Sequence, residues 1–310
     1  MRAFQGDSAN ELFSAAVRAV LEGGTSVSPR GHVTRELLDV HLRLANPRRR
    51  FVDLPPTRVP NPAFAVAEAL WILSGSDAPW IFKYNARLAQ FTDGGRLKGA
   101  YGPRIRHWHG DVDQVNEVRQ LLRKDRSSRR AAIQIFDPSI DHHEFKDVPC
   151  TLSYRFYFRD GRLDMHTTMR SQDVWLGLCY DLFTGTLLHE LMSSWLDMDL
   201  GAYHHHVDSL HLYERRLIDA QNIPVKAPPS ELMEPVTVPW ARFDGLLERV
   251  IGDSPPIDDR WHEFAAVMSS YRSWKDGHRD IALLKLDGKD GVLVRALRRW
   301  FERIATRLTA

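Results

Sequence analysis

Cysteine is scarce in this sequence, since only Cys150 and Cys179 occur among its 310 residues. Two cysteines form no disulfide framework, so we expect reduced thiols and a cytoplasmic location. No stretch reaches the roughly 18 consecutive apolar residues of a membrane span, and the opening M-R-A-F-Q-G-D-S-A-N-E-L-F lacks the apolar core of a signal peptide. Excess charge is also absent, because the formal net charge is +2. We therefore expect no stable nucleic-acid partner, although a few local arginines suffice to bind a small anion.

The sequence does contain the patterns of an ordinary globular protein, with 43% hydrophobic and 26% charged residues. Apolar spacing predicts helices over 8–22, 63–73, 112–124 and 182–198, and alternation around the turn Asp160-Gly161 predicts a hairpin over 151–168. Residues 33–54 indicate extended segments joined by a solvated turn that contains Arg48-Arg49-Arg50. These patterns predict an α+β core over 1–223. A mainly helical extension, 224–310, begins with a proline-rich stretch and is expected to pack on the core as one structural unit.

Two stretches contain the residue types of a nucleophile and an anion-binding site. Cys150 lies in D-V-P-C-T, just before the predicted hairpin, and the stretch R-S-Q-D-V-W-L-G-L-C-Y-D runs from Arg170 to Asp181. Each residue also has an ordinary interpretation: a lone cysteine is most often a small buried hydrophobic residue, and an aspartate before a helix is a common N-cap. Taken singly, these residues do not establish a site. Cys179, inside an apolar run, is expected to serve packing.

Glu68 is the one charged residue of the apolar helix predicted over 63–73. A carboxylate inside such a helix is costly unless it is paired or functional, so Glu68 is a candidate for function.

The run His204-His205-His206 suggests a metal site at first. Consecutive residues of a strand point to opposite faces, however, and no zinc-type ligand spacing surrounds the run, so we expect no bound metal.

Together with A-E-A-L-W-I-L-S-G, A-Y-G-P-R and S-L-H-L-Y, the two stretches resemble the active-site core of the thymidylate synthase family. The resemblance extends from about Arg30 to Tyr213. It implies a thymidylate synthase-like fold, in which a mixed, twisted β-sheet lies at a dimer interface and is flanked by helices. It also implies a small nucleotide as substrate and 5,10-methylenetetrahydrofolate as cofactor. The C-terminal segment is divergent.

The resemblance also implies catalytic roles. Cys150 matches the thiolate that adds to carbon 6 of the pyrimidine, and this chemistry needs a lowered thiol pKa, which nearby arginines could supply. Glu68 matches the carboxylate that organises water and moves protons around the base. Tyr101, in A-Y-G-P-R, matches a tyrosine near the nucleophile.

Binding roles follow from the same resemblance. In the family, a pair of arginines reaches the phosphate from the other subunit, and S-S-R-R matches this pair. The match implies a homodimer in which each phosphate site is completed by the partner's Arg129 and Arg130. The implied phosphate ligands are Arg30, Arg170, Ser171, Arg129 and Arg130; the sugar ligands are His211 and Tyr213; the folate-side residues are Asp173, Gly177, Leu88 and Phe91.

Asp181 stands where the family usually has asparagine, which recognises the edge of uracil, and an aspartate there resembles the cytidylate 5-hydroxymethylase branch. Cytosine presents a ring-nitrogen acceptor and an amino donor, and a carboxyl group matches this pair when one proton is shared between acid and ring. A carboxylate faces the carbonyl of uracil unfavourably and selects against it. We therefore expect Asp181 to select a cytidine monophosphate, either CMP or dCMP. Ser171 and Tyr213 favour the deoxy form.

Several positions depart from the synthase pattern. Leu88 and Phe91 stand about where two tryptophans line the family's site, and Thr57, Thr151 and Met169 replace a lysine, a histidine and a glutamine. The short apolar C-terminal tail is replaced by R-L-T-A. A wetter pocket favours addition of water and hence a 5-hydroxymethyl product.

Three alternatives stay open at this point. The first is a cytidylate methyltransferase that keeps the hydride step, and the second is a thymidylate synthase with relaxed base choice. The third is a non-catalytic relative that binds nucleotide or RNA. The intact Cys150, Glu68 and Arg170 argue against the third alternative.

Overall fold

A mixed β-sheet forms the centre of the fold. The computed structural model describes residues 2–256 and 258–309, and the sheet strands are β1 (Arg2–Gly6), β2 (Thr25–Val27), β3 (Thr34–Leu44), β4 (Ala132–Gln134), β5 (Thr151–Arg159), β6 (Arg162–Met169), β7 (Gln172–Asp173) and β8 (Asp199–Tyr213). Their order is β1-β3-β8-β6-β5-β4, with β2 on β3 and β7 on β8. Because β8 runs antiparallel to β3 and parallel to both β6 and β7, the predicted mixed sheet is confirmed.

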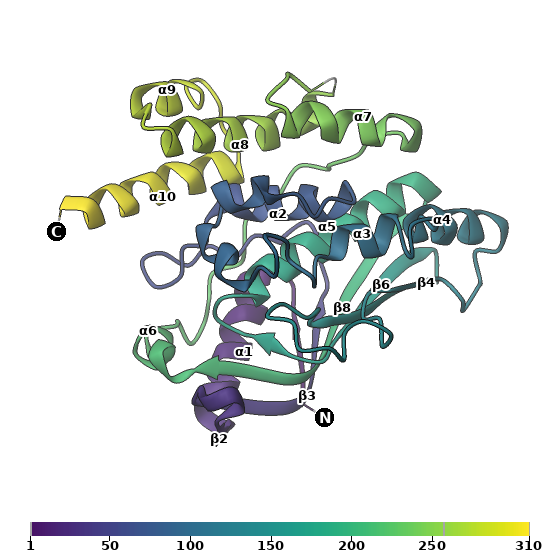
Figure 1. Ribbon diagram of the computed structural model, residues 1–310, viewed down its shortest axis with the longest axis horizontal. Helices are drawn as coiled ribbons and strands as arrows, with labels where there is room; N and C mark the ends of the chain where they lie inside the picture. The colour runs from purple at the N-terminus through teal and green to yellow at the C-terminus, as the bar shows by residue number, and fades with distance from the viewer. Residues whose placement is uncertain (1, 257, 310) are drawn as a thin grey trace.

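Helices pack against the sheet in two layers, as Figure 1 shows. In the first layer, α5 (Leu178–Leu196) packs on β6 and β8, and α2 (Pro62–Leu73) packs on α5. The second layer contains the C-terminal helices α7 (Trp240–Ile251), α8 (His262–Lys275), α9 (Arg279–Leu284) and α10 (Val292–Thr309). The other helices are α1 (Ala9–Gly23), α3 (Tyr101–Arg106), α4 (Gln114–Lys124) and α6 (Leu217–Gln221). None of the helices in the part of the chain that the structure describes is long and apolar enough to cross a membrane.

Local sequence explains where these elements begin and turn. Ser8 is the N-cap of α1, and Glu11 completes a capping box with it. The predicted hairpin is confirmed as β5 and β6. Its turn residues have positive φ, 49° at Asp160 and 78° at Gly161, as a two-residue hairpin of this twist requires. Helix α2 is apolar almost throughout because it lies between α5 and α8, and every one of its residues except Glu68 is buried.

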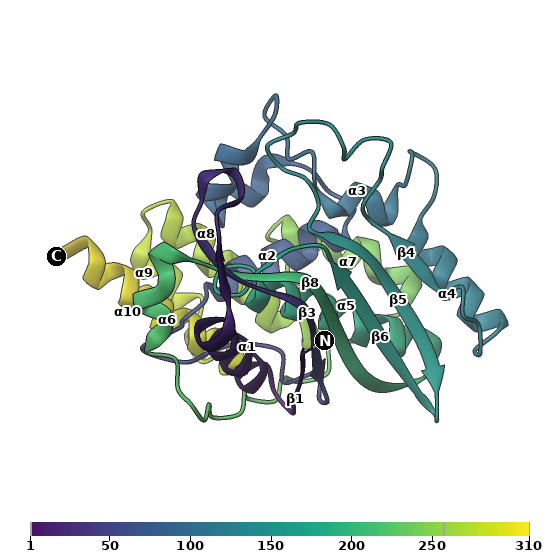
Figure 2. The ribbon, with the colours of Figure 1, turned by 90° about the horizontal axis from the view of Figure 1, so that it is seen from below.

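The opposite face of the sheet carries a row of histidines, on the side seen in Figure 2. His204 and His206 are half-buried on this face whereas His205 between them is fully buried, so the predicted alternation along this strand is confirmed. The rings of His41 and His206 stack at 4.2 Å, and those of His166 and His204 stack at 4.2 Å. Each histidine of the row therefore packs against another imidazole.

Two local predictions were wrong. Only Thr34–Leu44 of the region 33–54 is a strand, and the turn after it is not fully solvated, because Arg50 is completely buried and pairs with Glu190 of α5. The helix predicted over 182–198 begins at Leu178, so Asp181 lies within the first turn of α5 and is not its N-cap. Helix α7 was not predicted. Of the tail R-L-T-A, Ala310 lies outside the described residues, and the side chains before it are likewise not described.

The proline-rich stretch 224–239 is tied to the core by hydrogen bonds. Asn10 of α1 donates through Nδ2 to the carbonyl of Pro228 at 3.1 Å. The Met233 N–H donates to the carbonyl of Arg48 at 3.0 Å, and the Val236 N–H donates to Glu190 Oε1 at 3.2 Å. Glu190 therefore holds both this stretch and the buried guanidinium of Arg50. These contacts support the proposal of one structural unit.

Replacing Glu190 tests how much the fold depends on this buried pair. Glu190→Gln should lower the free energy of unfolding by about 3–5 kcal/mol, because it leaves a buried guanidinium without its counter-charge. Glu22→Gln is the matched control, since Glu22 pairs with Arg18 on the exposed surface of α1, where such a pair contributes about 0–1 kcal/mol. Urea unfolding followed by far-UV circular dichroism measures both variants. Equal losses in the two would contradict a special role for Glu190.

Candidate active site

The predicted site residues come together where β5 begins, β6 ends and α5 begins. Cys150 directly precedes β5, and its carbonyl accepts the N–H of Arg170 at 2.9 Å. The Arg170 guanidinium lies with Nη2 at 4.0 Å from the Cys150 sulfur. We call the following residues the Cys150 cluster: Glu68, Tyr101, Cys150, Arg170, Ser171, Asp181, His211 and Tyr213. All eight side chains are half-buried, which fits the wall of a cleft.

Arg170 fixes the segment that carries the thiol. Its Nε donates to the carbonyl of Pro149 at 2.9 Å, and its Nη2 donates to the carbonyl of Val148 at 3.0 Å. Those two bonds occupy one edge of the guanidinium, and Nη1 still carries two N–H donors of the kind that suits a phosphate oxygen. The N–H of Thr151, the residue after Cys150, donates to the Tyr101 hydroxyl at 3.2 Å. The backbone on both sides of Cys150 is thereby held by the side chains of Arg170 and Tyr101.

The thiol of Cys150 is not activated in the way the sequence suggested. Burial raises its pKa above the usual value, and the carboxyl groups of Asp181 and Asp147 add to this effect. Arg170 and Arg30 lower the pKa, but burial outweighs them. The expectation of a lowered thiol pKa was therefore wrong for the protein without ligand. Asp147, which accepts the N–H of Gly99 at 3.1 Å, is one contributor that sequence patterns did not reveal.

Glu68 and Asp181 form a pair of poorly solvated carboxyl groups. Burial raises the pKa of Glu68 well above its usual range, and the nearby carboxyl of Asp181 raises it further. Burial also raises the pKa of Asp181, to about 6, although a hydrogen bond from Gln172 opposes the shift. In that bond Gln172 Nε2 donates to Asp181 Oδ2 at 2.9 Å. Glu68 therefore holds its proton more firmly than an exposed glutamate, and the pKa of Asp181 lies at about 6.

The end of β8 supplies the residues expected to hold the sugar. The Ser171 hydroxyl lies 3.4 Å from His211 Nδ1, and the carbonyl of His211 accepts the N–H of Val174 at 2.8 Å. The ring of Tyr213 packs edge-on against His32 at 6.2 Å. Arg30, two residues before His32, is exposed and lowers the pKa of Cys150 across the intervening space. These contacts connect Ser171, His211 and Tyr213 at the end of β8, and Arg30 lies close enough to influence the thiol.

The structure separates Arg129 and Arg130 from the Cys150 cluster of the same chain. Both are exposed and precede edge strand β4, where the carbonyl of Ala131 accepts the N–H of Phe156 at 2.9 Å. Phe156 lies about six residues along β5 from Cys150, which corresponds to roughly 20 Å in a strand. Neither arginine can bind an anion at its own chain's thiol from there.

The residues expected near the folate show two kinds of environment. Asp173 is held by the N–H groups of Trp175 and Leu176, which donate to its Oδ1 at 2.8 and 2.9 Å. Burial nevertheless raises the pKa of its carboxyl group. Leu88 is half-buried against the core, and Phe91 is 44% exposed and offers an open ring face.

Glycine is needed at position 177 because the side chains of Gln172 and Asp181 approach its Cα closely. A Cβ atom there would lie 2.6 Å from Gln172 Nε2 and 3.3 Å from Asp181 Oδ2. Any other residue would displace the amide that binds Asp181. Gln172 is a site residue that the sequence analysis missed, although its place between Ser171 and Asp173 was a usable signal.

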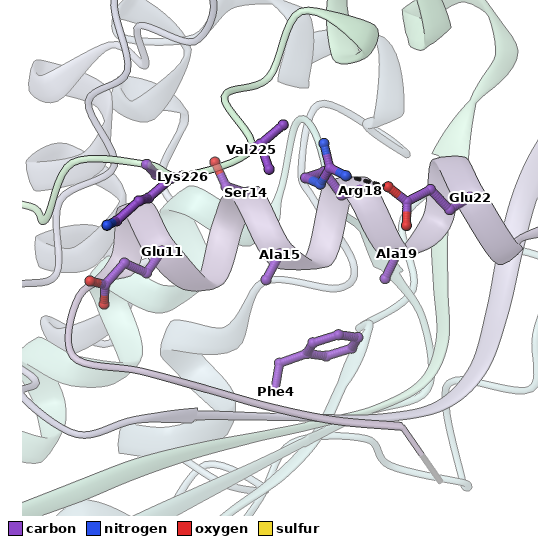
Figure 3. A pocket seen from close by; sticks show the side chains of 10 residues that line it. Phe4, Glu11, Ser14, Ala15, Arg18, Ala19, Glu22, Val225 and Lys226 are labelled. Atoms are coloured by element: carbon purple, nitrogen blue, oxygen red, sulfur yellow. Dashed lines mark hydrogen bonds and ion pairs between the residues drawn. The ribbon is translucent and has the colours of Figure 1, made fainter.

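Two hollows of the molecule lie apart from the Cys150 cluster. One, of about 420 Å³, lies between α1 and residues 225–227 and is lined by Phe4, Arg18 and Lys226 among others (Figure 3). The second, of about 440 Å³, lies on the histidine face of the sheet beside Arg155. No group of three or more His, Cys, Asp or Glu side chains in residues 2–256 and 258–309 is arranged to hold a metal ion.

Comparison with known proteins agrees with this geometry. The thymidylate synthase family profile matches residues 11–233. A deoxyuridylate hydroxymethyltransferase of Bacillus phage SP01 is 34% identical over 227 residues, which are 69% of this chain and 59% of the relative. Proteins of the same name from Pseudomonas phage M6 and Delftia phage PhiW-14 are 33% and 32% identical, over 51% and 57% of this chain.

The chain spans only about half the length of these relatives, since the matched segments cover 59%, 46% and 53% of them. The family match nevertheless includes every residue of the Cys150 cluster. It also confirms the predicted fold, an α+β domain with a mixed sheet and flanking helices. The chain therefore belongs to the thymidylate synthase family, whose cofactor is 5,10-methylenetetrahydrofolate, as the sequence predicted.

Proposed function

We propose that this protein transfers a one-carbon unit to carbon 5 of a cytidine monophosphate and releases the 5-hydroxymethyl nucleotide. The observation that carries the proposal is the poorly solvated carboxyl of Asp181 beside Cys150 and Glu68, where the family usually has an amide. Its pKa of about 6 allows it to share a proton with the ring nitrogen of cytosine near neutral pH. The substrate is the deoxy form, dCMP, since Ser171 and Tyr213 match the pattern of the deoxynucleotide enzymes.

Cys150 is the proposed nucleophile. Its sulfur forms a bond to carbon 6 of the base, which leaves electron density at carbon 5 for the new carbon–carbon bond. Loss of the proton from carbon 5 breaks the bond between the transferred carbon and its carrier, so that tetrahydrofolate leaves and an exocyclic methylene remains on the base. Water then adds to this methylene, and its oxygen becomes the hydroxyl group. Release of the sulfur restores the double bond of the ring. We assign the proton transfers of these steps to Glu68, whose pKa burial raises, and to Tyr101, whose hydroxyl accepts the N–H of Thr151.

Binding of the nucleotide is assigned to groups around the thiol. Arg170, Ser171 and Arg30 bind the phosphate, and His211 with Tyr213 holds the sugar. The partner's Arg129 and Arg130 complete the phosphate site, because the arginines of the same chain lie too far along β5. The protein is accordingly a homodimer with shared sites. A dianionic phosphate next to Arg170 and Arg30 balances the cluster's cations when the substrate is bound.

The cofactor is assigned to Asp173, Gly177, Leu88 and Phe91. When bound, 5,10-methylenetetrahydrofolate supplies the one-carbon unit. Leu88 and Phe91 cover less of a flat ring than two tryptophans do, and Phe91 is 44% exposed. This supports a pocket that admits water and hence a hydroxymethyl product over a methyl product.

A second candidate substrate is deoxyuridylate. The names of the three relatives favour it, because each is called a deoxyuridylate hydroxymethyltransferase. A protonated carboxyl resembles an amide in having one donor and one acceptor, so Asp181 can also complement uracil. Under this alternative the transfer chemistry is unchanged and only the base differs.

The product and the base choice test the proposed function directly. With dCMP and methylenetetrahydrofolate, mass spectrometry should find 5-hydroxymethyl-dCMP whose new hydroxyl carries oxygen-18 from labelled water. Asp181→Asn should reduce the preference for dCMP over dUMP by about 10- to 100-fold, or about 1.4–2.8 kcal/mol, because one buried polar match becomes a mismatch. A methylated product would replace the proposal by a methyltransferase. A wild-type protein that prefers dUMP would replace it by the second candidate.

The thiol's raised pKa predicts how Cys150 reacts with an alkylating reagent. Because burial favours the neutral thiol, the rate of iodoacetamide labelling should keep rising above the pH of about 8.5 at which a free cysteine is half ionised. Arg170→Gln should slow labelling at each pH below the thiol's pKa, since it removes a cation that lowers that pKa. Peptide mass spectrometry measures Cys150, and Cys179, which is 1% exposed, is the internal control. A rate that levels off below pH 8.5 would show an activated thiol instead.

Shared sites predict complementation between inactive subunits. A mixture of Cys150→Ala and Arg130→Ala proteins should regain part of the activity, because a hybrid dimer contains one site with both an intact thiol and an intact partner arginine. Subunit exchange is verified separately with differently tagged chains and native mass spectrometry. A mixture of Cys150→Ala and Arg170→Ala proteins is the matched control. Both residues belong to the site of a single chain, so no hybrid dimer contains an intact site and no activity should return. Recovery in the control mixture, or none in the test mixture, would refute the shared site.

A further inference from the structure

A chain of buried hydrogen bonds runs from the core of the sheet to Asp181. Gln172 Nε2 donates to Asp181 Oδ2 at 2.9 Å, and Gln172 Oε1 lies 3.0 Å from His205 Nε2. His205 Nδ1 lies 3.1 Å from the Tyr203 hydroxyl, which lies 2.7 Å from the hydroxyl of Thr167. Four side chains of β6, β7 and β8 thus connect end to end, and the last one binds the residue proposed to recognise the base.

The chain of bonds is shielded from solvent along its whole length. Thr167, Gln172, Tyr203 and His205 are 2%, 3%, 1% and 0% exposed. Water does not compete for these groups, so each bond is strong and each unpaired partner is costly. The arrangement also requires Gly177, because any Cβ there would lie where the Gln172 amide lies. The surroundings therefore hold the Gln172 amide in one position.

The direction of the bonds follows from one carbonyl group. Gln172 Nε2 also lies 3.3 Å from the carbonyl oxygen of Asp173, which can only accept, so the amide nitrogen must face it. The amide oxygen then faces His205 Nε2, which must donate. Burial, with the charges of His206 and His41, lowers the pKa of His205 to about 3, so its ring is neutral and carries one N–H. His205 Nδ1 therefore accepts from Tyr203, and Tyr203 accepts from Thr167.

This direction makes the two oxygens of Asp181 unlike each other. Oδ2 is held as an acceptor by Gln172, so a proton on the Asp181 carboxyl resides on Oδ1. Cytosine requires a donor at its ring nitrogen and an acceptor at its amino group, whereas uracil requires the reverse order. A carboxyl whose proton moves freely between its oxygens complements either base. One with a fixed proton complements only one base in a given pose.

We propose that Gln172 and His205 are positioning residues that fix the donor–acceptor order of Asp181 and thereby set the choice between cytosine and uracil. The inference deepens the proposed function, on which its link to the base rests. It also accounts for how an aspartate at this position could discriminate between cytosine and uracil. The residue type alone does not determine which carboxyl oxygen holds the proton, whereas the hydrogen bond from Gln172 does.

Other ionisable groups surround Asp181 and influence its proton. Glu68 faces it from α2, Asp173 from β7, and Cys150 from the start of β5. The remaining ones are Tyr101 on α3, Tyr154 on β5, Cys179 on α5 and Tyr203 on β8. Burial makes each of these groups hold its proton more firmly than in water. The hydrogen bond from Gln172 is the interaction that opposes this effect at Asp181, so its loss is expected to raise the Asp181 pKa.

The first test needs no variant. In the wild-type homodimer, nitrogen-15 NMR of the histidine side chains should show His205 as the neutral tautomer with its proton on Nε2, unchanged between about pH 5 and 8, where a free imidazole titrates. His205→Phe assigns the signal by its disappearance. The tautomer with the proton on Nδ1, or a titrating His205, would reverse or break the direction of the bonds and overturn the inference.

The second test breaks the chain of bonds next to Asp181. Gln172→Met keeps the side chain's length but removes its donor, so a carbon-13 NMR titration should place the Asp181 pKa above the value of about 6. The ratio of the dissociation constants for dCMP and dUMP, measured by calorimetry, should move towards unity by about tenfold, the scale of one lost buried hydrogen bond. His205→Phe should act in the same direction, because it frees the amide of Gln172 to turn over.

His206→Phe is the matched control, since His206 is the next residue of β8 but points to the opposite face of the sheet. It should leave the Asp181 pKa and the ratio of dissociation constants unchanged. If the wild type binds dUMP more tightly, the cytidylate proposal fails while the positioning role stands, provided Gln172→Met still moves the ratio towards unity. If Gln172→Met folds and changes neither readout, or if His206→Phe changes both, the positioning role fails whichever base is preferred.

Discussion

Two carboxyl groups and a thiol share one poorly solvated cluster in this protein, and much of the surrounding structure serves that arrangement. Burial disfavours the charged form of each group, so the pKa values of Glu68, Asp181 and Cys150 all rise. A group that holds its proton more firmly is a better donor of that proton in the proposed reaction. The same burial disfavours the thiolate of Cys150, the proposed nucleophile. A cation is therefore needed beside it, and Arg170 and Arg30 are the ones that lower its pKa.

The architecture places these groups by packing the cluster between layers. Glu68 projects from α2, a helix buried on all other sides between α5 and α8, so its carboxyl faces the only accessible direction. Asp181 lies in the first turn of α5, where exposed backbone N–H groups favour a negative charge and offset part of its burial. The C-terminal helices contribute indirectly, since α8 and α10 cover the far side of α2. A divergent extension thus supports the position of a residue in the matched core.

Sequence patterns predicted well where a residue's role depends on its neighbours in the chain. The hairpin turn at Asp160-Gly161, the cap at Ser8 and the alternation of His204, His205 and His206 all follow from local rules. The ion pair between Arg50 and Glu190 does not, because it joins residues 140 positions apart and nothing near Arg50 in the sequence distinguishes it from a solvated arginine. The pKa of Cys150 was misjudged for a similar reason. The arginines are visible as a motif, whereas the burial that outweighs them is a property of the packed cluster.

The role of Asp181 shows how far a single residue type determines specificity. An aspartate where asparagine is usual suggests cytosine, yet the relatives at 34%, 33% and 32% identity carry the name of a uridylate enzyme. The two observations are compatible in physical terms, because a carboxyl that holds a proton presents the same pair of functions as an amide. What distinguishes the bases is which oxygen holds that proton, and this depends on the buried neighbours of the carboxyl. If Asp181 recognises the base as proposed, specificity is a property of the hydrogen-bond network around the carboxyl, and a substitution at Gln172 or His205 should alter it while Asp181 stays in place.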